Sequence, residues 1–158
     1  MGSEFTANVN ATSNATANTD DVFILLKAAA SQTILLKRVR VSFAATTPAD
    51  WEAQISVGRD SATGTVTTSA AFTPIKRRQA GPASVSTAQT KSTTNSFAEG
   101  TNVDKPIKAS VNTRSVFEWI ARDEYDYIES PLSASYISII VQVSTASYLV
   151  NAECDWEE

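Results

Sequence analysis

The side chains that could do chemistry in this sequence are mostly carboxylates, gathered in two acidic runs. The runs comprise Asp123, Glu124 and Asp126, and then Glu153, Asp155, Glu157 and Glu158 at the end of the chain. Glycoside hydrolysis needs two carboxylates that face each other across a cleft, and calcium binds through the same kind of oxygen ligand. Neither run has the spacing of a calcium-binding loop, and such runs usually lie on solvated surfaces. We therefore expect no catalytic residue and no metal site.

The residue types that are missing or scarce exclude most enzyme classes. The 158 residues include no histidine, which removes Ser-His-Asp and Cys-His nucleophile systems and histidine-based metal sites. The five glycines are too few and too scattered to form a phosphate-binding loop. The single cysteine, Cys154, excludes an intrachain disulfide and lies in phase with apolar neighbours, which predicts a buried, unreactive thiol. The sequence thus predicts a protein that is not an enzyme and that binds no cofactor.

Basic side chains gather in the first part of the chain and acidic side chains in the last part. Residues 1–114 carry 12 basic and 8 acidic side chains, and residues 115–158 carry 1 basic and 9 acidic ones, so that +4 and −8 sum to −4. The basic clusters at residues 37–40 and 76–78 lack interleaved aromatic residues, and the low sequence pI opposes specific nucleic-acid binding. Two interpretations stay open: the charges face solvent on different strands, or opposite-sign patches guide assembly.

The elements that must position these side chains are β-strands. The alternation of apolar and polar residues that predicts them is clearest in residues 136–156. Apolar residues alternate with polar ones from Ile137 to Val143, and again from Tyr148 to Trp156. A period of two is typical of a strand with one buried and one wet face. A short polar turn separates the two segments, so we expect a β-hairpin whose strands lie at the centre of the fold.

The same pattern recurs along the chain and predicts an all-β fold. We expect further strands at residues 22–27, 33–44, 51–57, 84–97, 107–111, 115–121 and from Tyr125 onward. Lys37 falls on the apolar parity of its strand and should mark an end or a bend, residues 84–97 should form an edge strand, and residues 115–121 should be covered on both sides. About eight short strands separated by turn signals favour a single antiparallel β-sandwich.

The N-terminal residues differ from the rest of the chain in composition. Residues 1–5 (MGSEF) are typical of a cloning remnant. Residues 6–20 form a polar, low-complexity arm that should be flexible on its own. Such an arm either has no function or becomes ordered only when it binds a partner. The folded domain should then span residues 21–158. No secretion signal and no membrane-spanning apolar run is visible. We expect synthesis in the cytoplasm and no contact with a membrane.

The three tryptophans bear on carbohydrate binding. Sugar-binding sandwiches present exposed aromatic rings, and Trp51, Trp119 and Trp156 are the tryptophans available. All three lie in phase with the apolar faces of their strands, so we expect them to pack in the core.

The last third of the chain resembles small virion proteins of tailed bacteriophages. The resemblance lies in residues 125–132 (YDYIESPL), 136–143 (YISIIVQV) and 155–158 (DWEE), and in residues 36–43 (LKRVRVSF) followed by the strand at 51–57. It implies a jelly-roll sandwich that decorates or cements the phage head. The implied partners are further copies of the chain, a homotrimer being favoured, and the major capsid protein or another virion protein, with the virion as location. The alternative is a carbohydrate- or receptor-binding module of a phage tail or fibre.

Overall fold

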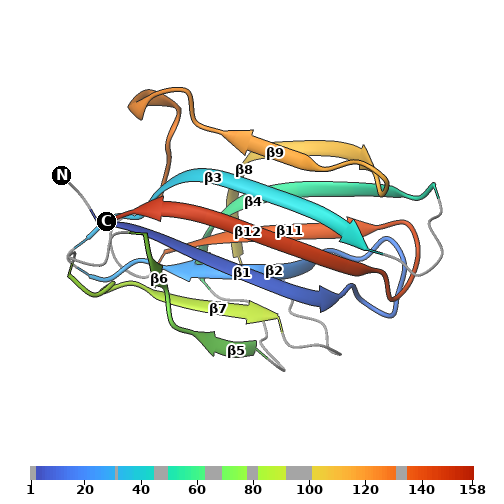
Figure 1. The fold of residues 1–158 in the computed structure, drawn as a ribbon, viewed down its shortest axis with the longest axis horizontal. Helices are drawn as coiled ribbons and strands as arrows, with labels where there is room; N and C mark the ends of the chain where they lie inside the picture. The colour runs from blue at the N-terminus through green and yellow to red at the C-terminus, as the bar shows by residue number, and fades with distance from the viewer. Residues whose placement is uncertain are drawn as a thin grey trace.

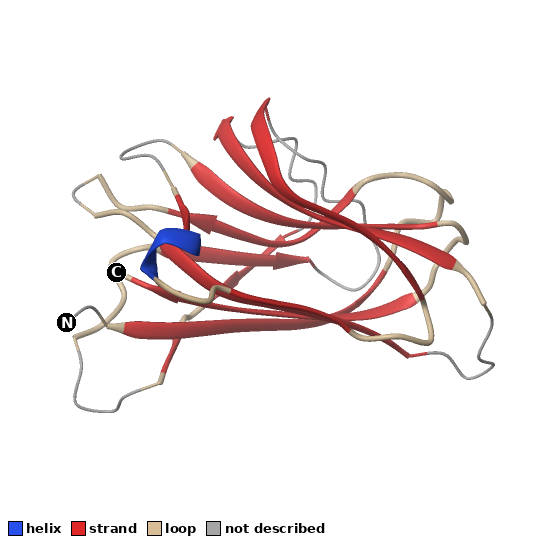
Figure 2. Cartoon of the chain, turned by 90° about the horizontal axis from the view of Figure 1, so that it is seen from above, coloured by secondary structure: helices blue, strands red, loops and turns tan. Residues whose placement is uncertain are grey.

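Two antiparallel β-sheets packed face to face make up the structure, a computed structural model that describes residues 3–30, 32–44, 50–62, 69–77, 82–91, 101–130 and 135–158. Sheet A contains β1 (Glu4–Thr12), β3 (Leu35–Ala44), β6 (Ile75–Lys76), β9 (Phe117–Ile120), β10 (Ile128–Glu129) and β12 (Leu149–Glu157). Sheet B contains β2 (Asp21–Lys27), β4 (Glu52–Ala62), β5 (Ser69–Phe72), β7 (Thr87–Lys91), β8 (Thr101–Asn112) and β11 (Tyr136–Val143). The two layers are visible in Figures 1 and 2. The prediction of an all-β sandwich is confirmed, with twelve strands in the described ranges rather than eight.

Eight of these strands follow the order of a jelly roll. In sheet A, β1, β12, β3 and β9 are neighbours, and in sheet B, β2, β11, β4 and β8 are neighbours. The chain changes sheet between β1 and β2, β2 and β3, β3 and β4, and again between β11 and β12. Two Greek keys wound into two four-stranded sheets define this architecture. The remaining strands β5, β6, β7 and β10 extend the sheets, which explains why the observed count exceeds eight.

The last two strands do not form the expected hairpin. β11 pairs with β2 and β4 in sheet B, whereas β12 pairs with β1 and β3 in sheet A, so the link after Val143 crosses from one sheet to the other. Both strands are central, as expected. β11 is apolar on both sides, because Ile139 packs in the main core while Ile140 joins Val22 and Leu25 in a second, smaller cluster. Strand periodicity reports burial and not the identity of the neighbour, which is why the pairing was wrong.

The N-terminal segment is a strand, which corrects the expected arm and the domain boundary at residue 21. β1 lies between β12 and β6, with its register against β12 running from Glu4 opposite Glu157 to Thr12 opposite Leu149. Phe5, Ala7 and Ala11 face inward and are buried. Backbone pairing with β12 and β6 stabilises the segment in the absence of a hydrophobic run. The folded domain therefore includes the segment from Glu4 onward, and only residues 13–20 form a loop.

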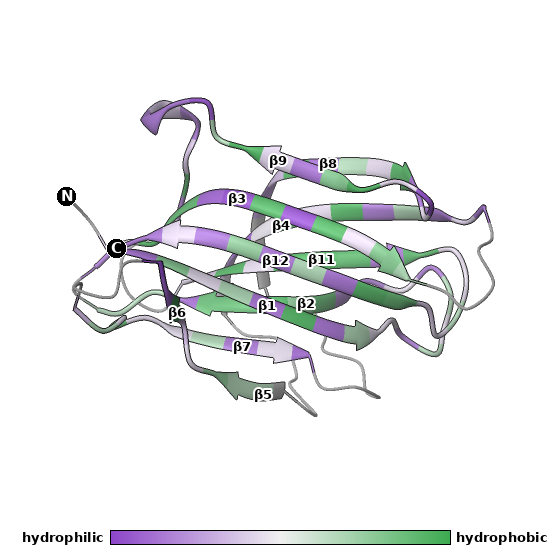
Figure 3. Cartoon of the chain, viewed as in Figure 1, coloured by the Kyte–Doolittle hydropathy of each residue, from purple (hydrophilic) through white to green (hydrophobic). Residues whose placement is uncertain are grey.

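One continuous core fills the space between the sheets. Its largest side chains are Trp156, Phe5, Phe23, Leu26, Leu36, Ile55, Ile137 and Ile139. Figure 3 shows the alternating hydrophobic and hydrophilic bands along β3 and β12 that this packing requires. Lys37 is the extra residue where Arg38 pairs with Asp155 and Leu36 pairs with Trp156, so the predicted irregularity at this position is confirmed as a β-bulge.

Three further expectations need correction. Residues 84–97 were predicted to form an edge strand, and residues 92–97 of this segment lie outside the described residues. The described part contains β7, which lies between β5 and β2 and is therefore not at the edge of sheet B. Tyr125 belongs to a 3-10 helix, η1 (Glu124–Asp126), and not to a strand, which begins only at β10. The segment at β9 is covered on one side only, since Val116 and Ile120 face solvent.

Candidate functional site

The C-terminal acidic run lies opposite basic side chains of the same sheet. On the outer face of sheet A, Arg38 of β3 contacts Glu118 at 2.8 Å and both Glu153 and Asp155 at 3.3 Å, and Arg77 reaches Asp155 at 3.1 Å. The register of β3 and β12 places these charges side by side. The basic and acidic halves of the sequence therefore meet within one chain. These side chains compensate one another within the sheet.

Lys37 closes the same network at the end of the sheet. Its ammonium group contacts Glu4 of β1 at 2.8 Å and Glu157 of β12 at 3.0 Å, and lies 5.4 Å from the ring centre of Tyr127. Partial burial alone would lower the pKa of Lys37, but the hydrogen bonds and charges of Glu4 and Glu157 outweigh it and raise the pKa above its ordinary value. Lys37 is thus a fixed cation that ties β1, β3 and β12 together. Its role is structural.

The first acidic run forms and caps η1. Asp123 accepts a hydrogen bond from the backbone N–H of Tyr125 at 3.0 Å and caps the helix. The hydrogen bonds from the side chain and backbone of Arg122, with its charge, lower the pKa of Asp126. A general acid requires the opposite shift. Among the described residues, no three metal-ligating side chains come together.

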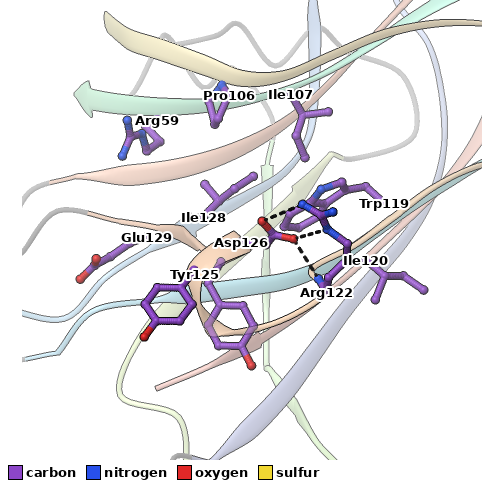
Figure 4. A pocket seen from close by; sticks show the side chains of 11 residues that line it. Arg59, Pro106, Ile107, Trp119, Ile120, Arg122, Tyr125, Asp126, Ile128 and Glu129 are labelled. Atoms are coloured by element: carbon purple, nitrogen blue, oxygen red, sulfur yellow. Dashed lines mark hydrogen bonds and ion pairs between the residues drawn. The ribbon is translucent and has the colours of Figure 1, made fainter.

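A groove with aromatic walls lies on the β9 side of the sandwich. It has a volume of about 610 Å³ and opens between the two sheets. Its walls comprise Arg59, Pro106 and Ile107 from β4 and β8, Trp119 and Ile120 from β9, and Arg122, Tyr125, Asp126, Tyr127, Ile128 and Glu129 from η1 and its flanks. Figure 4 shows the Arg122–Asp126 pair beside Trp119, with Arg59, Pro106 and Ile107 opposite. We call it the edge groove.

The edge groove offers stacking surfaces and fixed polar groups. Tyr125 is 89% exposed at its rim, Trp119 is half-buried in its wall, and Arg59 pairs with Asp104 beside it. Aromatic faces with a few oriented polar groups are typical of ligand sites. The sequence missed the groove because residues 117–129 were interpreted as two plain strands. The run of aromatic residues from Phe117 to Tyr127 was the available signal.

The tryptophans and the cysteine divide between the core and the surface. Trp156 is fully buried, Trp119 is partly buried, and Trp51 is exposed beside Thr113, so the core prediction fails for Trp51. Trp51 precedes β4, and its backbone pairs with Thr113 while its ring stays outside. Cys154 is buried, and desolvation raises the pKa of its thiol, which agrees with an unreactive cysteine.

Comparison with protein-family models, with curated proteins and with solved structures found no match for this chain. Within the described ranges, no helix is long and apolar enough to cross a membrane.

Proposed function

We propose that this chain is a non-enzymatic structural protein of a bacteriophage virion, which decorates or stabilises the capsid as a homo-oligomer bound to the head surface. Two features support the proposal: the jelly-roll strand order and the resemblance to small virion proteins. A sandwich of this kind offers surfaces rather than reactive groups. The partners would be further copies of the chain and the major capsid protein.

The observation that carries this proposal is an unburied apolar row beside β9. Val116 and Ile120 are 53% and 58% exposed and lie on the outer face of sheet A, on either side of Glu118. Glu118 is already held by Arg38. Contact with a second copy would remove the two apolar side chains from water without leaving a charge unpaired. A closed ring of three copies would bury this row in every subunit and would present repeated contacts to a lattice.

Light scattering after size-exclusion chromatography tests the oligomer. We expect a particle of three 16.9 kDa chains for the wild type, and a monomer for Ile120→Lys because the substitution places a charge in the contact. Ile75→Lys is the matched control, since Ile75 is a comparably exposed isoleucine on β6, at the opposite edge of sheet A. A monomeric wild type would refute the oligomer.

Electron microscopy of purified virions that carry a tagged copy tests the location. We expect regularly spaced density from the tag on the head surface. Particles that contain no tagged chain, in a host that expresses it, would refute the proposal.

The edge groove favours carbohydrate binding as a second candidate function, in a receptor-binding module of a phage tail or fibre. The exposed ring of Tyr125 stands beside the Arg122–Asp126 pair, and such a combination can stack on a sugar ring and bond its hydroxyl groups. On a glycan array, the wild type should bind at least one glycan and Tyr125→Ala should lose it. Trp51→Ala, which alters an exposed aromatic residue outside the groove, should bind normally. An array with no signal for the wild type contradicts this candidate.

A further inference from the structure

The most deeply buried ion pair of the described residues lies far from the surface network of sheet A. Lys91 ends β7, Asp21 begins β2, and their side chains are 1% and 0% exposed. The Lys91 ammonium group contacts a carboxylate oxygen of Asp21. In each other ion pair between described residues, at least one side chain is 23% exposed or more. Among these ion pairs of the described residues, Lys91–Asp21 is therefore the one shielded from solvent on both sides.

Buried apolar side chains lie beside this pair. Lys91 Nζ lies 5.2 Å from the ring centre of Phe23, and the neighbouring Val22 and Ile24 are buried. Removing two full charges from water is costly, and their attraction only partly offsets the cost. The neutral form of the same pair, an amine and a carboxylic acid, carries no charges for burial to penalise.

We propose that Lys91 and Asp21 are joined by an isopeptide bond. The lone pair of the neutral Lys91 Nζ attacks Cγ of the protonated Asp21 carboxyl group, and a C–N bond forms. The C–O bond to the hydroxyl group breaks, and this hydroxyl leaves with a proton from the amine as one molecule of water. The condensation neither oxidises nor reduces either side chain, so it needs no external reagent.

Position and desolvation both favour the reaction. The fold holds the amine against the carboxyl group, and well-oriented intramolecular pairs react with effective concentrations of about 10⁵–10⁸ M. A desolvated lysine amine is an effective nucleophile. Exclusion of bulk water also hinders hydrolysis of the product.

The bond would tie a weakly attached part of sheet B to the centre of the sandwich. β7 carries β5 on its outer side and pairs with β2 through only four residues, Ile24 to Lys27. A covalent link at the Asp21 end of β2 would hold this edge in place. A chain with one cysteine has no intrachain disulfide for this purpose. The inference is independent of the proposed function, because it concerns only the covalent structure of one chain.

Intact mass spectrometry of the denatured full-length chain tests the bond directly. We expect a mass about 18 Da below that calculated for the sequence, after allowance for removal of Met1. Asp21→Ala and Lys91→Arg should restore the full calculated mass. Lys105→Arg is the matched control, because Lys105 pairs with Asp20 in an exposed position and its substitution should keep the deficit. A wild type at full mass overturns the proposal, as does a deficit that persists in Lys91→Arg.

Peptide mapping locates the bond without depending on the folding of a variant. An acylated lysine resists trypsin, and Lys105 is followed by proline, so residues 1–27 should appear joined to residues 79–108. Separate peptides that end at Lys27 and at Lys91, in full yield, would contradict the assignment.

Discussion

Replacement of Phe5 by alanine tests whether the N-terminal segment is part of the folded domain. Phe5 is 1% exposed, its ring centre lies 5.9 Å from that of Trp156, and it faces Trp156 across the β1–β12 pairing. Truncation of a buried phenylalanine costs about 3–5 kcal/mol, because apolar contact is lost and a cavity remains. If the segment were a flexible arm, the same change would alter stability by less than about 0.5 kcal/mol.

The expected loss is large compared with the stability of a typical domain, about 5–15 kcal/mol. For a chain of this size it corresponds to a fall in Tm of about 6–20 °C. Urea unfolding followed by tryptophan fluorescence is a suitable assay, since Trp156 lies beside the substituted ring. Asn8→Ala, at an exposed position of the same strand, is the control and should leave the midpoint nearly unchanged. A Phe5→Ala variant as stable as this control would refute the docking of β1.

Three further predictions concern buried and paired polar groups. Ser138→Ala should destabilise the fold by about 1–3 kcal/mol in urea unfolding, because the Ser138 hydroxyl donates to the buried carboxylate of Asp60 at 2.6 Å; an unchanged midpoint would contradict this. Cys154 should not react with a disulfide reagent in the native protein and should react fully in urea, since burial raises its thiol pKa; rapid native labelling would show that β12 is open. Arg59 lowers the pKa of Asp104 below its ordinary value of 3.8, chiefly through their hydrogen bond. The stability advantage of the wild type over Asp104→Asn should therefore be complete above that pH and disappear as the pH falls below it; a pH-independent difference would contradict the pairing.

The residues of β3 show why part of the fold was readable from the sequence. Val39 and Val41 alternate with Arg38 and Arg40, and this local pattern requires a half-buried strand whatever its neighbours are. The position of Lys37 on the apolar parity indicated a local irregularity, and the structure places a β-bulge there. Such inferences succeed because they depend only on the direction of successive side chains.

The edge groove and the surface network were not readable in the same way. Arg38 meets Asp155 because β12 lies beside β3, although 116 residues separate them in the sequence. Trp119 and Arg59 line one groove because β9 and β4 end on the same side of the sandwich. Each depends on strand pairing over long distances, which local periodicity does not encode.

The sequence by itself determined that the chain consists of alternating strands and contains no histidine-based chemistry, since both follow from residue type and spacing. Only the tertiary structure decided that β11 and β12 lie in different sheets, and that β1 completes the core through Phe5. It also decided that the acidic C-terminal strand lies beside basic partners, and that Lys91 and Asp21 form a buried pair. The physical reason is that a strand acquires partners only when the chain closes, and burial of both sheets at once selects among the possible pairings.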